Sequence, residues 1–166
     1  ETCAAIRAAG GTGHALSGDV TKAVDLESVF AKIPRLDILV NNAGTNIPEP
    51  FVEVSEEHLD RVLDLNVRAA FLVAQASVRK MLTDPDRKTR GGVVINMSSQ
   101  MGHIGSPNRT VYCMTKHAIE GLTKAMAVEL APANIRVVSV APTFIDTPMT
   151  SPMFERPGFR DFVLDR

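Results

Sequence analysis

The chain carries Val93-Val-Ile-Asn-Met-Ser-Ser99, and thirteen residues after Ser99 it carries Tyr112-Cys-Met-Thr-Lys116. The first run is short, rich in β-branched residues and apolar, which predicts a buried strand. Tyr112 and Lys116 are four residues apart at the start of a helical pattern, so their side chains project from one face of that helix. We therefore expect a hydroxyl, a phenol and an ammonium group to meet at one place.

These three groups suit proton transfer to or from a carbonyl or alcohol oxygen. A free phenol has a pKa of about 10, too high for an efficient general base at neutral pH. A Lys ammonium roughly 4 Å away would favour the phenolate by about 4 kcal/mol at an effective dielectric constant of about 20, so we expect Lys116 to bring Tyr112 towards neutrality. Ser99 could then polarise the substrate oxygen. Each residue alone has a plainer interpretation: a core Tyr, a solvated Lys, or a Ser that ends a strand.

Strand patterns and helix patterns alternate along the chain, which predicts an α/β fold with a parallel sheet built from right-handed βαβ units. Continuous apolar strands such as residues 36–41 fit burial on both faces. Ser55 is a candidate N-cap, because two glutamates follow it in the first turn. The expected strands are residues 14–20, 36–41, 93–99 and 135–141, and the expected helices are residues 1–9, 25–33, 55–82 and 110–131.

The composition of the chain limits the kinds of partner that we expect. The 166 residues suit one domain, and a net charge of −1 gives no reason to expect nucleic acid or an anionic membrane as a partner. No apolar run approaches the ~18 residues of a membrane span. Two cysteines, Cys3 and Cys113, make no disulfide framework, so we expect a reducing cytoplasm. The four histidines show no ligand spacing, and no metal site is expected. His103 is interpreted as a solvated loop residue.

Four short motifs occur in an order that resembles the short-chain dehydrogenase/reductase family, and the similarity runs from about Gly13 to Thr147. The motifs are Asp19-Val20, Asn41-Asn42-Ala43-Gly44, Tyr112-x-x-x-Lys116 preceded by Ser99, and Pro142 five residues before Thr147. The resemblance implies a doubly wound, three-layer, Rossmann-like fold that binds NAD or NADP. It also implies an enzyme that interconverts a secondary alcohol and a ketone of the sugar, polyol or 3-oxoacyl type. Tyr112 would be the proton donor or acceptor.

Two other functions stay open. An epimerase or dehydratase of the family's extended branch shares Tyr-x-x-x-Lys. A non-catalytic dinucleotide-binding regulator is the second alternative, although such proteins usually lose the Tyr or the Lys. The resemblance further implies a homo-oligomer, a dimer or a tetramer, that packs through residues 55–82 and 110–131.

The resemblance also implies the cofactor contacts. Asp19 would accept from the adenine amino group with the Val20 backbone beside it, and Asn42 would lie near the adenosine ribose, where Ala43 and Gly44 allow close approach. Lys116 would bond the nicotinamide ribose beside Tyr112. After Pro142, Ile145 and Thr147 would hold the carboxamide, although Thr143 stands where the family usually has Gly. Asn41 and Asn42 could instead satisfy backbone groups at a strand end.

Asn66 lies on the apolar stripe of the helix expected over residues 55–82. A buried Asn in a helix is costly unless its amide is hydrogen-bonded. One interpretation is a structural amide that bonds a neighbouring carbonyl group. The resemblance implies the other: an Asn that bends the helix and holds a water linked to Lys116, as part of a proton relay.

The resemblance suggests an incomplete domain. The family's glycine-rich phosphate loop follows a first strand, whereas Gly11-Thr12-Gly13 precedes a strand-like segment. We therefore expect residues 1–166 to be one partial dinucleotide-binding and catalytic domain, without the N-terminal loop and the C-terminal end, and inactive alone. In the family's strand order, residues 14–20 would then have no neighbour to pair with.

Overall fold

The computed structural model describes residues 1–147 and 150–164. Its sheet has three parallel strands in the order β1 (Ile38–Asn41), β2 (Gly92–Met97) and β3 (Ile135–Val140). Ile38 pairs with Val93 and Gly92 with Ile135, so the three strands end at the same edge of the sheet. The expected α/β class and parallel sheet are confirmed, and the sheet is incomplete.

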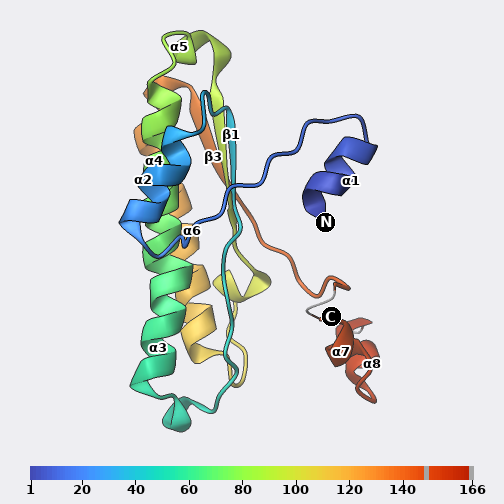
Figure 1. The fold of residues 1–166 in the computed structure, drawn as a ribbon. Helices are drawn as coiled ribbons and strands as arrows, with labels where there is room; N and C mark the ends of the chain where they lie inside the picture. Colours follow the sequence, from blue (N-terminus) through green and yellow to red (C-terminus); the bar gives the residue numbers. More distant parts are fainter. Residues whose placement is uncertain (148–149, 165–166) are drawn as a thin grey trace.

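Long helices cover one face of this sheet (Figure 1). The first combines α3 (Glu56–Leu63), a π-helical segment η2 (Asp64–Ala69) and α4 (Ala70–Leu82), and α6 (Thr110–Leu130) lies beside it. Ser55 caps α3 as expected, because its hydroxyl accepts from the His58 amide at 3.2 Å. The remaining elements are α1 (Thr2–Ala8), α2 (Ala23–Ala31), η1 (Phe51–Glu53), α5 (Arg87–Arg90), η3 (Gln100–Gly102), η4 (Ala131–Ala133), α7 (Ser151–Phe154) and α8 (Phe159–Leu164).

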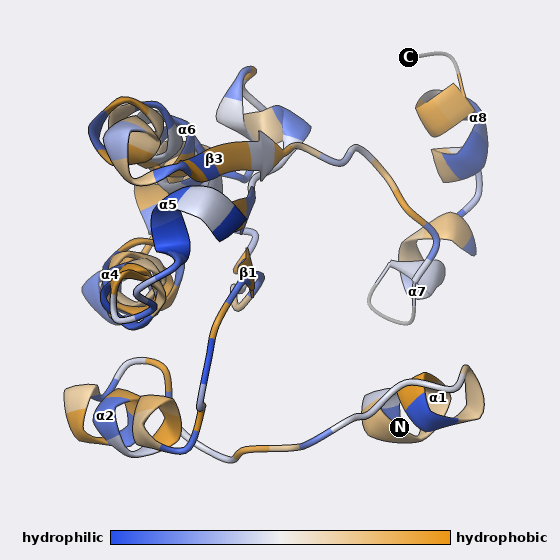
Figure 2. Cartoon of the chain, turned by 90° about the horizontal axis from the view of Figure 1, so that it is seen from above, coloured by the Kyte–Doolittle hydropathy of each residue, from blue (hydrophilic) through white to orange (hydrophobic). Residues whose placement is uncertain are grey.

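The core lies between the sheet and these helices. Its buried apolar cluster consists of Val78, Met81, Val94, Ile135 and Val137. The opposite face of the sheet carries apolar residues that stay open, since Ile38 is 59% and Val40 56% exposed. Figure 2 shows α4 and α6 on one side of the strands and α1, α7 and α8 standing apart on the other. The buried core therefore lies on one face of the sheet.

The expectation of a strand over residues 14–20 is wrong, because the chain there is extended but pairs with no strand. A strand is defined by the hydrogen bonds that a neighbour supplies, and the described residues supply none at this place. Helix α1, which precedes this segment, forms as expected but buries none of its residues. The N-terminal segment therefore contributes little to the core.

The end of the sheet where the strands begin is fixed by one buried cation. Arg87 is 3% exposed and donates to the carbonyl oxygens of Met81 (2.9 Å), Leu36 (2.8 Å) and Gly91. Asp84 adds a carboxylate 3.4 Å away. Because these partners come from the end of α4 and from the entries to β1 and β2, Arg87 joins three elements.

Candidate active site

Two serines follow β2 at the edge where the strands end. The Ser98 amide donates to the Val140 carbonyl at 2.8 Å, and the Gln100 amide to the Pro142 carbonyl at 3.0 Å. Ser99 lies between these contacts, is 9% exposed, and its hydroxyl accepts from the Met101 amide at 3.2 Å. The sheet thus fixes the backbone of Ser99 through pairing that continues past the end of β2.

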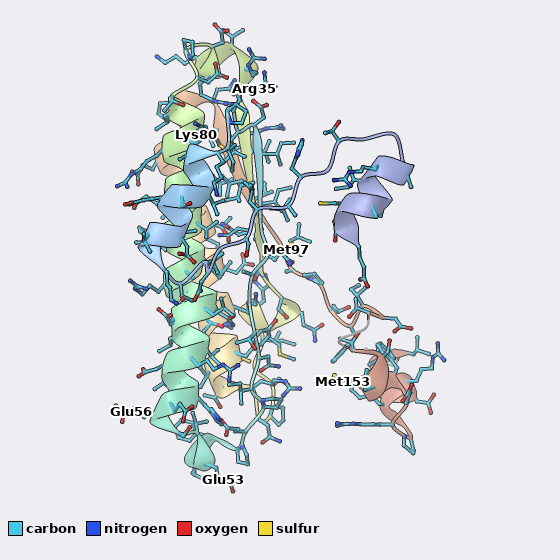
Figure 3. The ribbon with its side chains drawn as sticks, viewed as in Figure 1. Arg35, Glu53, Glu56, Lys80, Met97 and Met153 are labelled. Carbon is cyan, nitrogen blue, oxygen red and sulfur yellow. The ribbon has the colours of Figure 1, made fainter. Side chains whose placement is uncertain are left out.

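Helix α6 presents Tyr112 and Lys116 to the same edge. The Lys116 amine lies 5.5 Å from the centroid of the Tyr112 ring and donates to the Met97 carbonyl at 2.7 Å. Figure 3 labels Met97, the last residue of β2, near the middle of the molecule. Lys116 is 7% exposed, whereas Tyr112 is half-buried. The spacing of four residues therefore does place both side chains on one face of α6.

The protonation of this pair differs from the sequence-based expectation. Burial raises the pKa of the Tyr112 phenol, although a hydrogen bond with Ser99 and the charge of Arg109 act to lower it. Burial lowers the pKa of the Lys116 amine. Both shifts run against the expectation that Lys116 brings Tyr112 towards neutrality, because burial has the largest effect on each group. With its pKa raised, the Tyr112 phenol keeps its proton at pH 7.

Asn66 lies in the π-helical segment and is 2% exposed. Its Oδ1 accepts from the Thr45 amide and its Nδ2 donates to the Thr45 carbonyl, both at 2.8 Å. Nδ2 also lies 3.2 Å from the Thr115 hydroxyl, on the residue before Lys116. These contacts match the structural interpretation of a bonded amide, and the π-helical turn matches the expected interruption of a regular helix.

The motif after β1 divides into a buried and an exposed part. Asn41 is buried, and its amide donates to the Ala70 carbonyl of α4 (2.8 Å) and to the Asn96 side chain (3.2 Å), so its role is structural although its partners are not the expected strand-end backbone groups. Asn42, Ala43 and Gly44 are exposed beyond the strand. A Cβ atom at Gly44 would lie 3.3 Å from Oδ1 of Asn66, so glycine lets this loop pack closely against that amide.

Asp19 and Val20 lie before α2 in an exposed turn. Hydrogen bonds from the Thr21 hydroxyl (2.7 Å) and amide (3.0 Å) lower the pKa of the Asp19 carboxyl. The Arg68 guanidinium, in the same π-helical segment as Asn66, donates to the Thr21 carbonyl at 3.1 Å. The turn is thereby tied to η2, and one oxygen of Asp19 is used by its own turn.

Pro142, Ile145 and Thr147 follow β3. Pro142 stays beside the Ser99 loop through its carbonyl, whereas Ile145 is 56% exposed and the chain then leaves the body for α7 and α8 (Figure 1). The Thr147 hydroxyl lies 2.9 Å from that of Thr150. Among the described residues, positive φ angles outside glycine occur at Asn108 and Asn134, so Thr143 is not strained.

Sequence reasoning did not find the partners of the site residues. Thr45 and Thr115 hold Asn66, and the Met97 carbonyl holds Lys116. A carbonyl group has no signature in a sequence. Thr115 could have been found, because it lies inside the Tyr-x-x-x-Lys motif.

Two kinds of feature are absent from the described residues. In residues 1–147 and 150–164, no helix combines the length and the apolar character that crossing a bilayer would need. The same ranges contain no group of three metal-ligating side chains.

Comparison with known proteins gives consistent results. Cyclopentanol dehydrogenase from Comamonas testosteroni is 42% identical over 163 residues, which cover 95% of this chain and 62% of that protein. An NAD⁺-bound xylitol dehydrogenase structure matches with a TM-score of 0.80 at 32% identity, over 89% of this chain and 57% of the other. A gluconate 5-dehydrogenase from Burkholderia cenocepacia, in complex with NADP and tartrate, matches with a TM-score of 0.86 at 25% identity, over 97% and 63%.

The chain thus spans less than two thirds of the length of these proteins. The family model for short chain dehydrogenases matches residues 1–158, nearly the whole chain. The ordered motifs, the parallel sheet and this match lead to the same conclusion. The chain belongs to the short chain dehydrogenase family.

Proposed function

We propose that this chain carries the catalytic side chains of an NAD(P)-dependent oxidoreductase that interconverts a secondary alcohol and a ketone. One observation carries the proposal: Ser99, Tyr112 and Lys116 come together at the edge where the strands of a parallel sheet end. Ligands of open α/β sheets bind at this edge. The similarity to cyclopentanol, xylitol and gluconate 5-dehydrogenases supports the same reaction class.

The proposed roles follow from the protonation states. In the reductive direction, the neutral phenol of Tyr112 donates its proton to the substrate oxygen, and the Ser99 hydroxyl holds that oxygen in place. The Lys116 amine, 5.5 Å from the centroid of the Tyr112 ring, supplies a route for reprotonation of the phenol. A bound nicotinamide ring supplies or accepts the hydride. In the oxidative direction the proton returns to Tyr112, which must first be deprotonated.

The residues present fit both halves of the cofactor. Asn42, Ala43 and Gly44 form an exposed backbone at the edge where the strands end, and a small residue there leaves room for a sugar. We propose that this segment contacts the adenosine ribose and that Lys116 bonds the nicotinamide ribose. We propose that Pro142, Ile145 and Thr147 hold the carboxamide. The second oxygen of Asp19, which lies 3.6 Å from the Lys22 amine, would contact the adenine beside Val20.

We propose that Asn66 supports the proton relay in a way that differs from direct water binding. Its amide group holds the Thr45 backbone and the Thr115 hydroxyl, so it ties the loop after β1 to α6 at the residue before Lys116. Asn66 is then a positioning residue, because it acts through its neighbours.

Activity assays test the proposal. The protein is expressed at the full length of its gene, and NADH and NADPH oxidation is measured with a panel of cyclic ketones, keto-sugars and 3-oxoacyl thioesters. We expect oxidation of one cofactor by at least one class. Conversion of a nucleotide sugar with no net change in the cofactor would instead identify the epimerase alternative. Cofactor binding without turnover of any substrate would identify the regulator.

We also propose a homo-oligomer in the cytoplasm. Phe71 on α4 is 47% and Val128 on α6 80% exposed, so apolar side chains remain on the outer faces of the two helices that would pack against a second copy. Free Cys3 and Cys113 support a reducing compartment. Sedimentation of the wild type and Val128→Glu tests the first point, because a charge on that face should dissociate the oligomer.

A further inference from the structure

Glu120 is a buried carboxylate that the proposed reaction does not use. It is 7% exposed and lies four residues beyond Lys116, so Tyr112, Lys116 and Glu120 follow one another along one face of α6. A buried carboxylate is costly without partners. Its position next to the candidate site makes its contacts informative.

Three elements meet at this carboxylate. Oε2 accepts from the Ser139 hydroxyl of β3 at 2.9 Å. Oε1 lies 3.4 Å from Nε2 of His103, in the loop after Ser99. Oε1 and the Ser98 hydroxyl are buried without a hydrogen bond of good geometry, and Ser98 lies near enough to the carboxylate to lower its pKa. Glu120 therefore contacts both β3 and the loop that follows Ser99.

The Ser99 loop is packed tightly onto this carboxylate. A Cβ atom at Gly102 would lie 2.7 Å from the Ser98 hydroxyl, 3.0 Å from the Lys116 carbonyl and 3.2 Å from Cγ of Glu120. The loop thus leaves no space between itself and α6, and a displacement of the Glu120 side chain would move the backbone that carries Ser99.

The charges around Glu120 keep it ionised. Burial raises the pKa of its carboxyl, but Ser98, Ser139, His103 and Lys124 together hold the pKa below its usual range. Since the carboxylate is charged at neutral pH, its hydrogen bond with Ser139 is charge-assisted and stronger than a neutral one.

We propose that Glu120 is a positioning residue that ties α6 to the ends of β2 and β3 and so sets the contact between the Ser99 hydroxyl and the Tyr112 phenol. The catalytic meaning of this role rests on the proposed function. The contact between Ser99 and Tyr112 can be tested without any activity, because the hydrogen bond with Ser99 acts to lower the pKa of the phenol. Loss of Glu120 should therefore raise the pKa of Tyr112 whether or not the protein is active.

The test is an ultraviolet titration of the phenol, with the titration of Tyr112→Phe subtracted so that only Tyr112 contributes. We expect Glu120→Ala to raise the pKa of Tyr112 and to lower kcat about tenfold or more with little change in KM for the cofactor. Glu120→Gln, which can still accept from Ser139, should restore most of both values. Glu129→Ala, an exposed change on the same helix, is the control and should match the wild type.

A folded Glu120→Ala protein with the wild-type phenol titration would overturn the proposal. If Glu120→Ala does not fold, Ser139→Ala decides, because it removes the donor and leaves the carboxylate in place. A rise in the pKa of Tyr112 supports the tie, and an unchanged pKa overturns it. A wild type that is inactive on every substrate but shows these titration changes would refute the proposed function and leave the role of Glu120 intact.

Discussion

Replacing Lys116 by Met tests whether the amine acts as a full positive charge on the Tyr112 phenol. Burial lowers the pKa of the amine and raises that of the phenol, so we expect the charge of the amine to contribute little when Tyr112 ionises. Removing it should then leave the phenol titration nearly unchanged in the protein without cofactor. The sequence alone predicts the opposite, a strong effect of a permanent positive charge.

The structure gives the size of that opposite effect. The amine lies 5.5 Å from the ring centroid of Tyr112. A full charge at this distance would contribute about 3 kcal/mol at an effective dielectric constant of about 20. This energy is more than about a hundredfold in the acid dissociation constant of the phenol. The two accounts therefore differ by an amount that a titration resolves easily.

The assay is the ultraviolet titration of the phenolate in wild type and Lys116→Met, with Lys124→Met as a control for the loss of an exposed amine on the same helix. We expect the acid dissociation constant of Tyr112 to stay within about threefold in both variants. A decrease of about a hundredfold in Lys116→Met alone would show that the amine is charged beside the phenol, and it would refute the expectation that this charge contributes little.

Three further predictions concern stability, measured by urea unfolding. Gly102→Ala should destabilise the fold by about 1–3 kcal/mol through overpacking, whereas Gly105→Ala, with nothing within 4 Å of its new methyl group, should be close to neutral; equal effects would contradict the packing described. Asn66→Ala should cost about 1–3 kcal/mol, because it leaves the partly buried Thr45 backbone without its two hydrogen bonds to the amide. Arg87→Met should cost at least about 3 kcal/mol, since several carbonyl oxygens lose a charged donor together, and a loss under about 1 kcal/mol would show that the carbonyls find other partners.

The sequence predicted the helices and strands that depend on the pattern of neighbouring residues. The strand at β2 and the helix at α6 follow from periodicity, and the cap at Ser55 follows from one residue type. The shared face of Tyr112 and Lys116 follows from helical geometry alone. These inferences did not require any contact between distant segments.

Features that depend on distant partners could not be predicted. Residues 14–20 have the composition of a strand, but pairing is a property of two segments. The directions in which the pKa values of Tyr112 and Lys116 shift depend on burial, which the sequence does not state. Arg87 and Glu120 read like surface charges in the sequence, and only the fold shows that they are buried.

The central claim is that the Tyr112 phenol gives its proton to the substrate oxygen. The most direct measurement compares the wild type with Tyr112→Phe, which keeps the ring and removes the hydroxyl, in cofactor-dependent reduction of whichever ketone proves to be a substrate. Cofactor affinity is measured in parallel to show that the site still forms. We predict a loss of about 10²–10⁴-fold in kcat with cofactor binding retained. A Tyr112→Phe protein that reduces the ketone at the wild-type rate would contradict the claim.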